Sequence, residues 1–317
     1  MAAPGTSPVS VILDGECDTR DTDSLLAGIL QANGDVSDLI FSPGRLPQVE
    51  IHGQLLTVQG PTVHVLTPDD TRRIASDLIG NNKQAITILR GEGSCDISYG
   101  LPGIARFRVN AFIQRGSCAV VMRVISTTVP TLSFLGLPRE LGTIADADDG
   151  IVLIAGLRGS GKSTTLAALI DHINQHRVCH LITIEDPIEF LHNHKRATIH
   201  QRELHSDTPN VALALRAAMR QSPDVIVVSE LHNRETIEGV LDAAATGHLV
   251  LSTVNAPDVE KAIERILSVF PASDQDVVRG RLAHTLRCVV SQKLIPKQDA
   301  RGRTPVVEIV RPHLTQQ

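Results

Sequence analysis

Aromatic side chains are scarce in this 317-residue chain, which has no tryptophan, one tyrosine and six phenylalanines. Because nucleic-acid bases stack on such rings, the chain offers few platforms for a single strand. A basic excess is also missing, since 35 acidic residues outnumber 30 basic ones and the formal net charge is −5. A local basic patch stays open, but without a global basic field we expect no nucleic-acid partner.

Paired cysteines and long apolar runs are missing too. The chain has five scattered cysteines without a C-x-x-C pair: Cys17, Cys95, Cys118, Cys179 and Cys288. Neither a disulfide framework nor a zinc site is therefore predicted. The first residues lack a basic segment followed by an apolar one, and no run reaches the roughly 18 apolar residues of a membrane span. We expect a cytoplasmic protein that reaches a membrane only through partners.

The most specific motif lies in the stretch IVLIAGLRGSGKSTTLAALI. Residues 151–155 form an unbroken apolar run, which is typical of a strand buried on both faces. The next residues fit G-x-x-x-x-G-K-[ST], and good helix formers follow them. The pattern predicts a phosphate-binding loop between a strand and a helix. Its members are Gly156, Leu157, Arg158, Gly159, Ser160, Gly161, Lys162, Ser163 and Thr164.

The residue types in this loop suit a nucleoside triphosphate. Glycines let successive backbone N–H groups point at a polyanion, and the helix that follows adds its positive dipole end. Lys162 is expected to reach the β- and γ-phosphates, and the Ser163 hydroxyl is expected to ligate Mg²⁺. The motif predicts the ligand but not how the energy is used.

The N-terminal part predicts a small α+β domain over residues 23–125. Residues 1–22 are rich in Pro, Ser, Gly and Asp and predict a flexible extension. A helical pattern starts at Asp23, and alternating apolar and polar residues then indicate short antiparallel strands. Thr67 is expected to cap a second helix.

Four arginines are interleaved with apolar residues in the last strands of this domain: Arg106, Arg108, Arg115 and Arg123. They are either the solvated face of a half-buried sheet or, in part, arginine fingers that stabilise a γ-phosphate in an adjacent subunit. Their spacing does not decide between the two.

A Pro- and Gly-containing segment, 126–142, predicts a domain linker. Over 143–317 strands alternate with helices, so the fold class is α/β with a parallel sheet of the RecA kind. Two helical stretches are expected near its end. The second runs over 273–295 and places Val277, Leu282 and Leu286 on one face.

Acidic residues follow two predicted strands of this second domain. Glu185, Asp186 and Glu189 come after the strand that starts at His180, where they either hold Mg²⁺ through water and orient an attacking water, or form a solvated loop. Glu230 follows the apolar strand DVIVVS and is the expected catalytic base; the alternative is a carboxylate at a helix start.

His248 follows a helix that ends in small residues. It either senses phosphate or bridges to a neighbouring subunit, or it caps the helix.

The four stretches GLRGSGKST, TIEDPIEF, DVIVVSE and TGHLVLSTVNAPD resemble, in this order, the Walker A, Asp box, Walker B and His box of the PilT family of type II/IV secretion ATPases. The resemblance implies a PAS-like N-terminal domain joined to a RecA-like ATPase domain. It further implies a homo-hexamer that couples ATP hydrolysis to movement of an inner-membrane pilus platform protein, with a paralogous pilus ATPase as a further partner. A tetracysteine zinc insertion is missing, which favours the retraction branch.

The resemblance also assigns roles to single residues. It implies that Lys162 and Ser163 bind ATP and Mg²⁺, that Glu185 and Glu189 form the acidic box, and that Glu230 is the catalytic glutamate.

The same comparison places His248 in the His box and makes Arg106, Arg108 and Arg115 candidates for reaching phosphate in trans.

Some positions depart from the family pattern. Ser229 stands where a glycine is usual, 231–233 replaces a Met-Arg-Asp run, and Asn255 replaces a second histidine, so it can hydrogen-bond but carries no charge. Three functions remain: a retraction motor for twitching motility, a degenerate paralogue that binds ATP and regulates an active motor, or another export or DNA-uptake motor.

Overall fold

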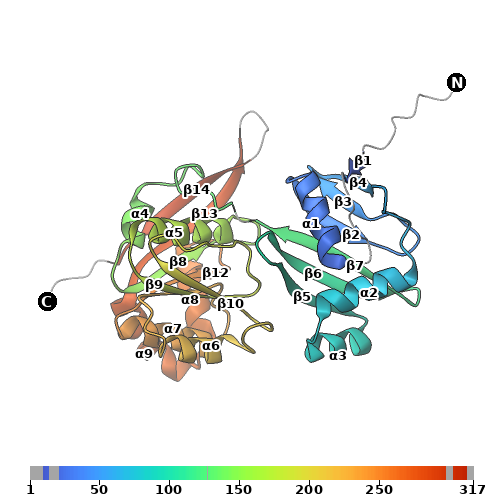
Figure 1. Cartoon of the computed structure of the whole chain (residues 1–317). Coiled ribbons are helices and arrows are strands. Elements are labelled where there is room, and N and C mark those ends of the chain that lie inside the picture. Colours follow the sequence, from blue (N-terminus) through green and yellow to red (C-terminus); the bar gives the residue numbers. More distant parts are fainter. Residues whose placement is uncertain (1–9, 14–20, 127, 298–302, 313–317) are drawn as a thin grey trace. The chain divides into compact units, whose positions relative to one another are not determined.

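A computed structural model describes residues 10–13, 21–126, 128–297 and 303–312. The chain divides into two compact units, 1–126 and 127–317, each with its own seven-stranded sheet (Figure 1). The division falls at the start of the predicted linker. In the parts that the structure describes, no helix is long and apolar enough to cross a membrane.

The first unit is built on a sheet in the order β1-β4-β3-β2-β7-β6-β5. Its strands are β1 (Ser10–Ile12), β2 (Val36–Phe41), β3 (Gln48–Ile51), β4 (Gln54–Gln59), β5 (Ser94–Leu101), β6 (Ala105–Gln114) and β7 (Ser117–Ile125). The helices are α1 (Thr22–Ala32), α2 (Pro68–Ile79) and α3 (Lys83–Glu92). Phe107, Val109 and Ala111 alternate with more exposed residues along β6 and fill the core. The predicted α+β class is therefore confirmed.

Two parts of this unit differ from the sequence-based prediction. Ser10–Ile12 pairs in parallel with β4, and Val11 and Leu13 are buried, so the apolar run VIL adds a strand inside the predicted extension of residues 1–22. The rest of that extension, 1–9 and 14–20, lies outside the described residues. Helix α3 was not predicted; Ala85 is its one fully buried residue, and Ile86, Ile88 and Leu89 pack against the core from its partly buried side.

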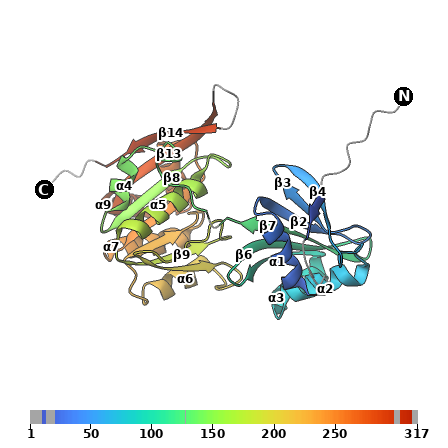
Figure 2. The ribbon, with the colours of Figure 1, turned by 45° about the horizontal axis from the view of Figure 1, so that its top comes forward.

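The second unit has the sheet order β10-β9-β11-β12-β8-β13-β14, in which β14 alone is antiparallel to its neighbour (Figure 2). The strands are β8 (Gly150–Ala155), β9 (His180–Glu185), β10 (Thr198–Glu203), β11 (Val225–Val228), β12 (Leu249–Val254), β13 (Leu286–Pro296) and β14 (Arg303–Val310). The helices are α4 (Glu140–Ala145), α5 (Lys162–His176), α6 (Val211–Ala218), α7 (Arg234–Ala245), α8 (Val259–Ser268) and α9 (Ala272–Thr285).

Helices cover both faces of this sheet. Residues of α4 and α5 pack on one face, and residues of α6 to α9 pack on the other. All six residues of β8 are consequently buried, as its unbroken apolar run predicts. The RecA-like α/β fold is confirmed.

The predicted linker is shorter than expected. Leu132, Leu135, Leu137 and Leu141 pack into the core on the α5 side, so most of 126–142 belongs to the second unit. Burying these leucines against the sheet is favourable because it removes their apolar side chains from water, and it fixes the segment to the second unit.

The prediction of a helix through residue 295 was wrong. Helix α9 ends at Thr285, and Leu286 begins β13, which pairs in parallel with β8. Val277 of the expected apolar face is 66% exposed. The neighbouring Val289 and Val290 favour a strand and are buried on opposite faces of the sheet.

Candidate nucleotide site

The carboxyl ends of four parallel strands meet at one edge of the second sheet. Ala155 of β8 pairs with Val254 of β12, and Val228 of β11 pairs with Ser252 and Ile184. The glycine-rich loop after β8 and the acidic segments after β9 and β11 therefore start at the same edge. The fold thus brings Lys162, Ser163, Glu185, Glu189 and Glu230 into one neighbourhood, as expected for an open α/β sheet.

The loop between β8 and α5 has the conformation that its glycines permit. Gly159 and Gly161 have φ values of +77° and +87°, which residues with a Cβ rarely adopt. Gly161 is the N-cap of α5, so the loop ends on the positive dipole end of a 15-residue helix. This arrangement of strand, loop and helix is suited to binding a phosphate group.

Lys162 lies against this loop. Its Nζ donates hydrogen bonds to the carbonyl oxygens of Gly156, at 2.8 Å, and Leu157, at 3.1 Å. Burial lowers the pKa of Lys162, while the nearby charges of Glu230 and Glu189 act in the opposite direction. The ammonium group therefore lies between the phosphate loop and two carboxylates.

Ser163 and Glu189 form the second polar pair of the site. The Ser163 hydroxyl donates to Glu189 Oε1 at 2.8 Å. Both residues line a small cavity of about 30 Å³ together with Glu185 and His192. Hard oxygen donors of this kind fit Mg²⁺, which binds one or two protein oxygens and completes its shell with water and phosphate.

Glu185 is more deeply enclosed. Its Oε1 accepts hydrogen bonds from the Thr183 hydroxyl at 2.6 Å and from Gln201 Nε2 at 2.9 Å. Burial raises the pKa of Glu185, more than these hydrogen bonds lower it. Among the residues that the structure describes, no three Asp, Glu, His or Cys side chains are placed to hold a metal on their own. A Mg²⁺ ion at Ser163, Glu189 and Glu185 thus needs oxygen ligands from phosphate or water.

Glu230 follows β11 on a loop that is tied to β12. The Thr253 hydroxyl donates to the Ser229 carbonyl at 2.6 Å, and Leu231 N donates to the Thr253 carbonyl at 2.9 Å. Helix α7 begins four residues later, and Asn233 is its N-cap. The geometry therefore does not favour the alternative role of Glu230 as a helix-start carboxylate.

His248 lies away from this site. It precedes β12, whereas the phosphate loop follows the parallel strand β8, so the length of a six-residue strand, about 20 Å, separates them. Its Nδ1 lies 2.9 Å from the Ala243 carbonyl and 3.1 Å from the Thr246 hydroxyl at the end of α7. These contacts are those of a helix cap, and a bridge to a neighbouring subunit stays a prediction.

The candidate arginine fingers belong to the first unit. Arg106 and Arg108 alternate with the buried residues Phe107 and Val109, so they lie on the face of the sheet away from the core, where Arg108 is exposed and Arg106 is half-buried. Arg108 Nε lies 4.0 Å from Asp96 Oδ1.

The other two arginines have different surroundings. Arg115 has a φ of +47° in the turn between β6 and β7. Arg123 Nε donates to Asp38 Oδ1 at 2.9 Å and is thus engaged within its own unit.

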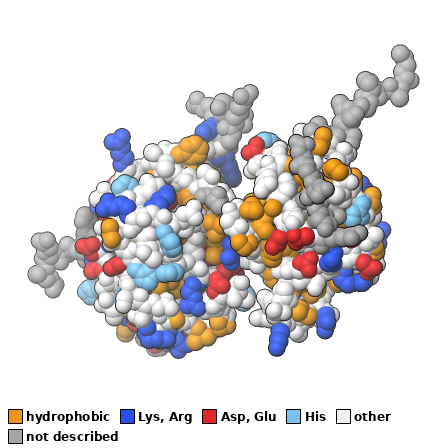
Figure 3. Space-filling view, viewed as in Figure 1, with side chains coloured by type: hydrophobic (Ala, Val, Ile, Leu, Met, Phe, Trp, Pro, Cys, Tyr) orange, Lys and Arg blue, Asp and Glu red, His pale blue; other side chains and the backbone are white. Residues whose placement is uncertain are grey.

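Basic and acidic side chains are interspersed on the face drawn in Figure 3. Three arginines of α9 and β13 have acidic partners within the second unit. Each forms an ion pair, Arg279 with Asp276, Arg281 with Asp242, and Arg287 with Asp149. They favour a solvated charged surface over a nucleic-acid track.

Two residues that contact the phosphate loop and the start of α5 are not predicted from the sequence. Gln292 of β13 bridges Ser160 and Thr165, and Arg303 of β14 donates to the Gly159 carbonyl at 3.3 Å. The sequence pattern predicts a helix over 273–295, and a helix there does not bring Gln292 to the loop. The available signal is the β-branched pair Val289 and Val290, followed by the polar residues Ser291 and Gln292.

The chain is similar to known proteins over most of its length. A family model described as "Type II/IV secretion system protein" matches residues 76–317. The "Type IV pilus retractation ATPase PilT" of Pseudomonas aeruginosa is 40% identical over 295 residues, which cover 92% of this chain and 82% of that protein. The "Type IV pilus ATPase PilU" of the same organism is 38% identical over 274 residues, covering 86% and 70%.

A solved structure is similar over most of the chain. The "Crystal Structure of the Pilus Retraction Motor PilT and Bound ADP" matches with a TM-score of 0.79 and 38% identity, covering 88% of this chain and 80% of that one. The similarity therefore includes both units.

Proposed function

The chain is an ATPase that belongs to the type II/IV secretion system protein family, and we propose that it is the motor that retracts a type IV pilus. Its similarity to PilT supports this function. The observation that carries the proposal is the arrangement of Lys162, the Ser163–Glu189 pair and Glu230 at one sheet edge. A phosphate-binding loop with acids beside it is the arrangement that phosphoryl transfer to water requires.

Each residue of the site has a distinct role in the proposed hydrolysis. Lys162 and the loop N–H groups bind the phosphates, and Ser163 with Glu189 and Glu185 would hold Mg²⁺. A bound Mg²⁺ supplies charge neutralisation at the phosphate oxygens. Glu230 orients the attacking water and accepts its proton.

We further propose that the chain acts as a homo-hexamer at the cytoplasmic side of an inner-membrane platform protein. In a ring, Arg106, Arg108 and Arg115 of one subunit reach the nucleotide of its neighbour and stabilise the charge that develops on the phosphate. His248 then lies at a subunit boundary.

A regulatory paralogue is the second candidate. PilU, a second pilus ATPase, is nearly as similar to this chain as PilT, with 38% against 40% identity. Ser229 directly precedes the candidate catalytic residue Glu230, and Asn255 directly follows β12, the strand that pairs with β11. In this case the chain binds ATP tightly, co-assembles with an active ATPase and hydrolyses little by itself.

Turnover of ATP by the purified chain decides between these functions. A motor hydrolyses ATP with Mg²⁺ at a rate near the enzyme median of about 10 per second, and both Lys162→Ala and Glu230→Gln abolish the activity. Mass in solution with and without ATP reports the ring. Tight binding with background turnover would support the paralogue instead, and turnover that neither substitution affects would overturn the site.

A second experiment addresses retraction itself. The gene is expressed in a piliated bacterium from which the retraction ATPase has been deleted. A retraction motor restores twitching by itself, whereas a regulatory paralogue requires that an active ATPase be supplied with it. Expression of the Glu230→Gln variant serves as the control.

A further inference from the structure

The side chain of Gln292 connects β13 to the phosphate loop and to the first turn of α5. This side chain is 2% exposed. The Nε2 atom donates to the Ser160 carbonyl at 2.7 Å, and Oε1 accepts from the Thr165 hydroxyl at 2.8 Å. Because a carbonyl oxygen only accepts, the nitrogen must face Ser160, and this fixes the orientation of the amide. One buried side chain thus joins the loop to the helix that follows it.

The bond to Ser160 sets the direction of an N–H group in the loop. The Ser160 carbonyl and the Gly161 N–H belong to one trans peptide plane, in which they point in opposite directions. Since Gln292 holds the carbonyl toward β13, the Gly161 N–H points away from β13. A phosphate loop depends on such N–H directions, because they are its main contacts with the anion.

Gln292 also explains two glycines of the motif. A Cβ on Gly161 would lie 2.8 Å from Gln292 Nε2, and a Cβ on Gly156 would lie 2.7 Å from the Gln292 carbonyl oxygen and overlap the Ser160 hydroxyl. The loop packs so closely on Gln292 that no side chain fits between them. A side chain at residue 156 would collide with the Gln292 backbone and with Ser160, and one at residue 161 would displace the Gln292 amide and adopt an unfavourable positive φ.

We propose that Gln292 is a positioning residue of the nucleotide site, which holds the Ser160–Gly161 peptide in the orientation that binds phosphate. The inference rests on the proposed nucleotide-binding function. Only a carboxamide fits both neighbours, because it donates to Ser160 and accepts from Thr165. Gln292→Met retains the length of the side chain but removes both the donor and the acceptor, and it adds no group that can ionise.

The test compares ADP binding with the thermal stability of the ligand-free chain. Gln292→Met is expected to weaken ADP binding at least about tenfold, because the buried Ser160 carbonyl loses its donor and the Ser160–Gly161 peptide is no longer held. The rise in melting temperature on adding ADP shrinks accordingly. Thr165→Val removes the other hydrogen bond and is expected to weaken binding by a smaller factor in the same direction.

Ser291→Ala is the matched control. Ser291 is the preceding residue of β13, is 6% exposed, and points to the other face of the sheet, where its hydroxyl contacts the Pro257 carbonyl at 3.5 Å. This variant loses a buried polar contact on the same strand but should bind ADP like the wild type. Lys162→Ala checks that the wild-type binding is at the phosphate loop.

The outcomes distinguish a residue that positions the loop for ADP from one that only stabilises the fold. If Gln292→Met lowers the melting temperature of the free chain as Ser291→Ala does but binds ADP with wild-type affinity, Gln292 only stabilises the fold and the inference is wrong. If the wild type itself binds no ADP, the proposed function fails first. Should Gln292→Met not fold, Gln292→Leu gives the same comparison with a shorter side chain.

Discussion

The Ser163 hydroxyl donates a hydrogen bond to Glu189 Oε1 at 2.8 Å, and this contact joins the first turn of α5 to the loop after β9. The two oxygens come from segments 26 residues apart. Both line the small cavity at the edge of the sheet, beside Glu185. A hydroxyl and a carboxylate held this close can serve one cation together, and the pair therefore predicts coupled behaviour toward Mg²⁺.

Ser163→Ala and Glu189→Gln are each expected to lower Mg²⁺-dependent ATP turnover by about tenfold or more. The double variant should be little worse than the more impaired single variant, because both residues act through one ion. Turnover measured against Mg²⁺ concentration tests this. Glu235→Gln, at an exposed acid in the first turn of α7, serves as the control. Losses that multiply in the double variant would argue for two independent roles.

His192 predicts how stability changes with pH. It lies beside Glu185 in the small cavity, and burial lowers its pKa from 6.5 to about 4. The unfolded chain therefore binds this proton more readily than the folded one. Stability is present in full above pH 6.5 and is lost as the pH falls toward 4. The gap between the two values corresponds to about 3 kcal/mol of unfolding free energy.

His192→Phe should flatten the fall in melting temperature between pH 6.5 and 4, because phenylalanine keeps a ring in the cavity and does not titrate. Hydrogen exchange at each pH gives the same comparison for the second unit alone. The exposed His284 of α9 provides the control variant, His284→Gln, which should follow the wild-type curve. Identical pH curves for wild type and His192→Phe would show that this histidine is not buried as a neutral group.

Sequence patterns located the local parts of the nucleotide site. The unbroken apolar run before Gly156 predicts a strand buried on both faces, and β8 is such a strand. The acids after β9 and β11 could be assigned because strand ends in an open parallel sheet meet at one edge.

Contacts between distant segments could not be predicted. Gln292 reaches Ser160 across 132 positions, and its place depends on β13 pairing with β8. The pattern of Val277, Leu282 and Leu286 fits a helix up to the residue where β13 begins, so periodicity gave the wrong element there. Similarly, Val11 and Leu13 are too few to predict a strand until β4 supplies its partner.

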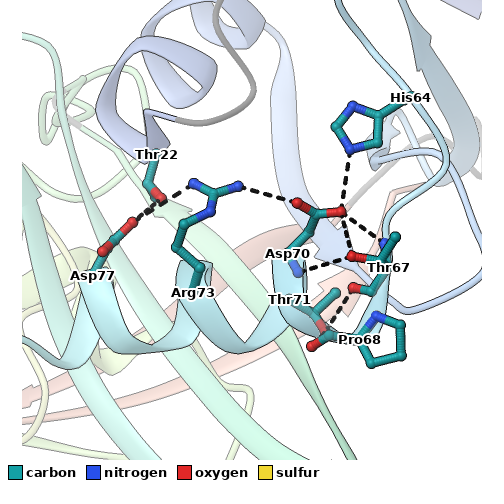
Figure 4. A network of polar contacts seen from close by, with 8 residues as sticks. All are labelled: Thr22, His64, Thr67, Pro68, Asp70, Thr71, Arg73 and Asp77. Atoms are coloured by element: carbon teal, nitrogen blue, oxygen red, sulfur yellow. Dashed lines mark hydrogen bonds and ion pairs between the residues drawn. The ribbon is translucent and has the colours of Figure 1, made fainter.

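Asp70 at the start of α2 predicts a stability effect in the first unit. Its Oδ2 accepts from the Thr67 N–H at 2.8 Å and from the Thr67 hydroxyl at 2.7 Å, and its own N–H donates back to that hydroxyl (Figure 4). His64 and Arg73 also contact the carboxylate. The hydrogen bonds from Thr67 hold the pKa of Asp70 well below its ordinary value.

Asp70→Asn is therefore expected to destabilise α2 by about 1 kcal/mol, the usual value of a helix cap. The difference in stability between wild type and Asp70→Asn should vanish at a pH well below 3.8, where Asp70 is protonated and therefore uncharged, like the asparagine. Because the chain has no tryptophan, hydrogen exchange of residues 68–79 is the measurement. Asp69→Asn, at a neighbour that pairs only at the surface with Arg72, should change exchange little. Equal effects of the two substitutions would contradict the cap.

Among the candidate arginine fingers, Arg108 is held only weakly within its own unit. Its side chain is 54% exposed, and its nearest acid, Asp96, is 4.0 Å away, so the ion pair contributes little stability. Arg123 pairs with Arg108 across β6 and β7 but is tied to Asp38 at 2.9 Å. Substitution of Arg108 therefore tests the finger, and substitution of its cross-strand neighbour Arg123 is the control.

Arg108→Ala is expected to reduce ATP turnover strongly if Arg108 acts on the nucleotide of a neighbouring subunit, whereas Arg123→Ala should leave turnover nearly unchanged. Arg108→Ala subunits keep an intact phosphate loop, and Lys162→Ala subunits keep the arginine. Mixed in equal amounts, they should form complete sites at about a quarter of the boundaries of a cyclic ring, although each is inactive alone. Turnover of the mixture measures this recovery. A mixture as inactive as its parts, or an Arg108→Ala variant with full activity, would leave Arg108 as part of the solvated sheet face.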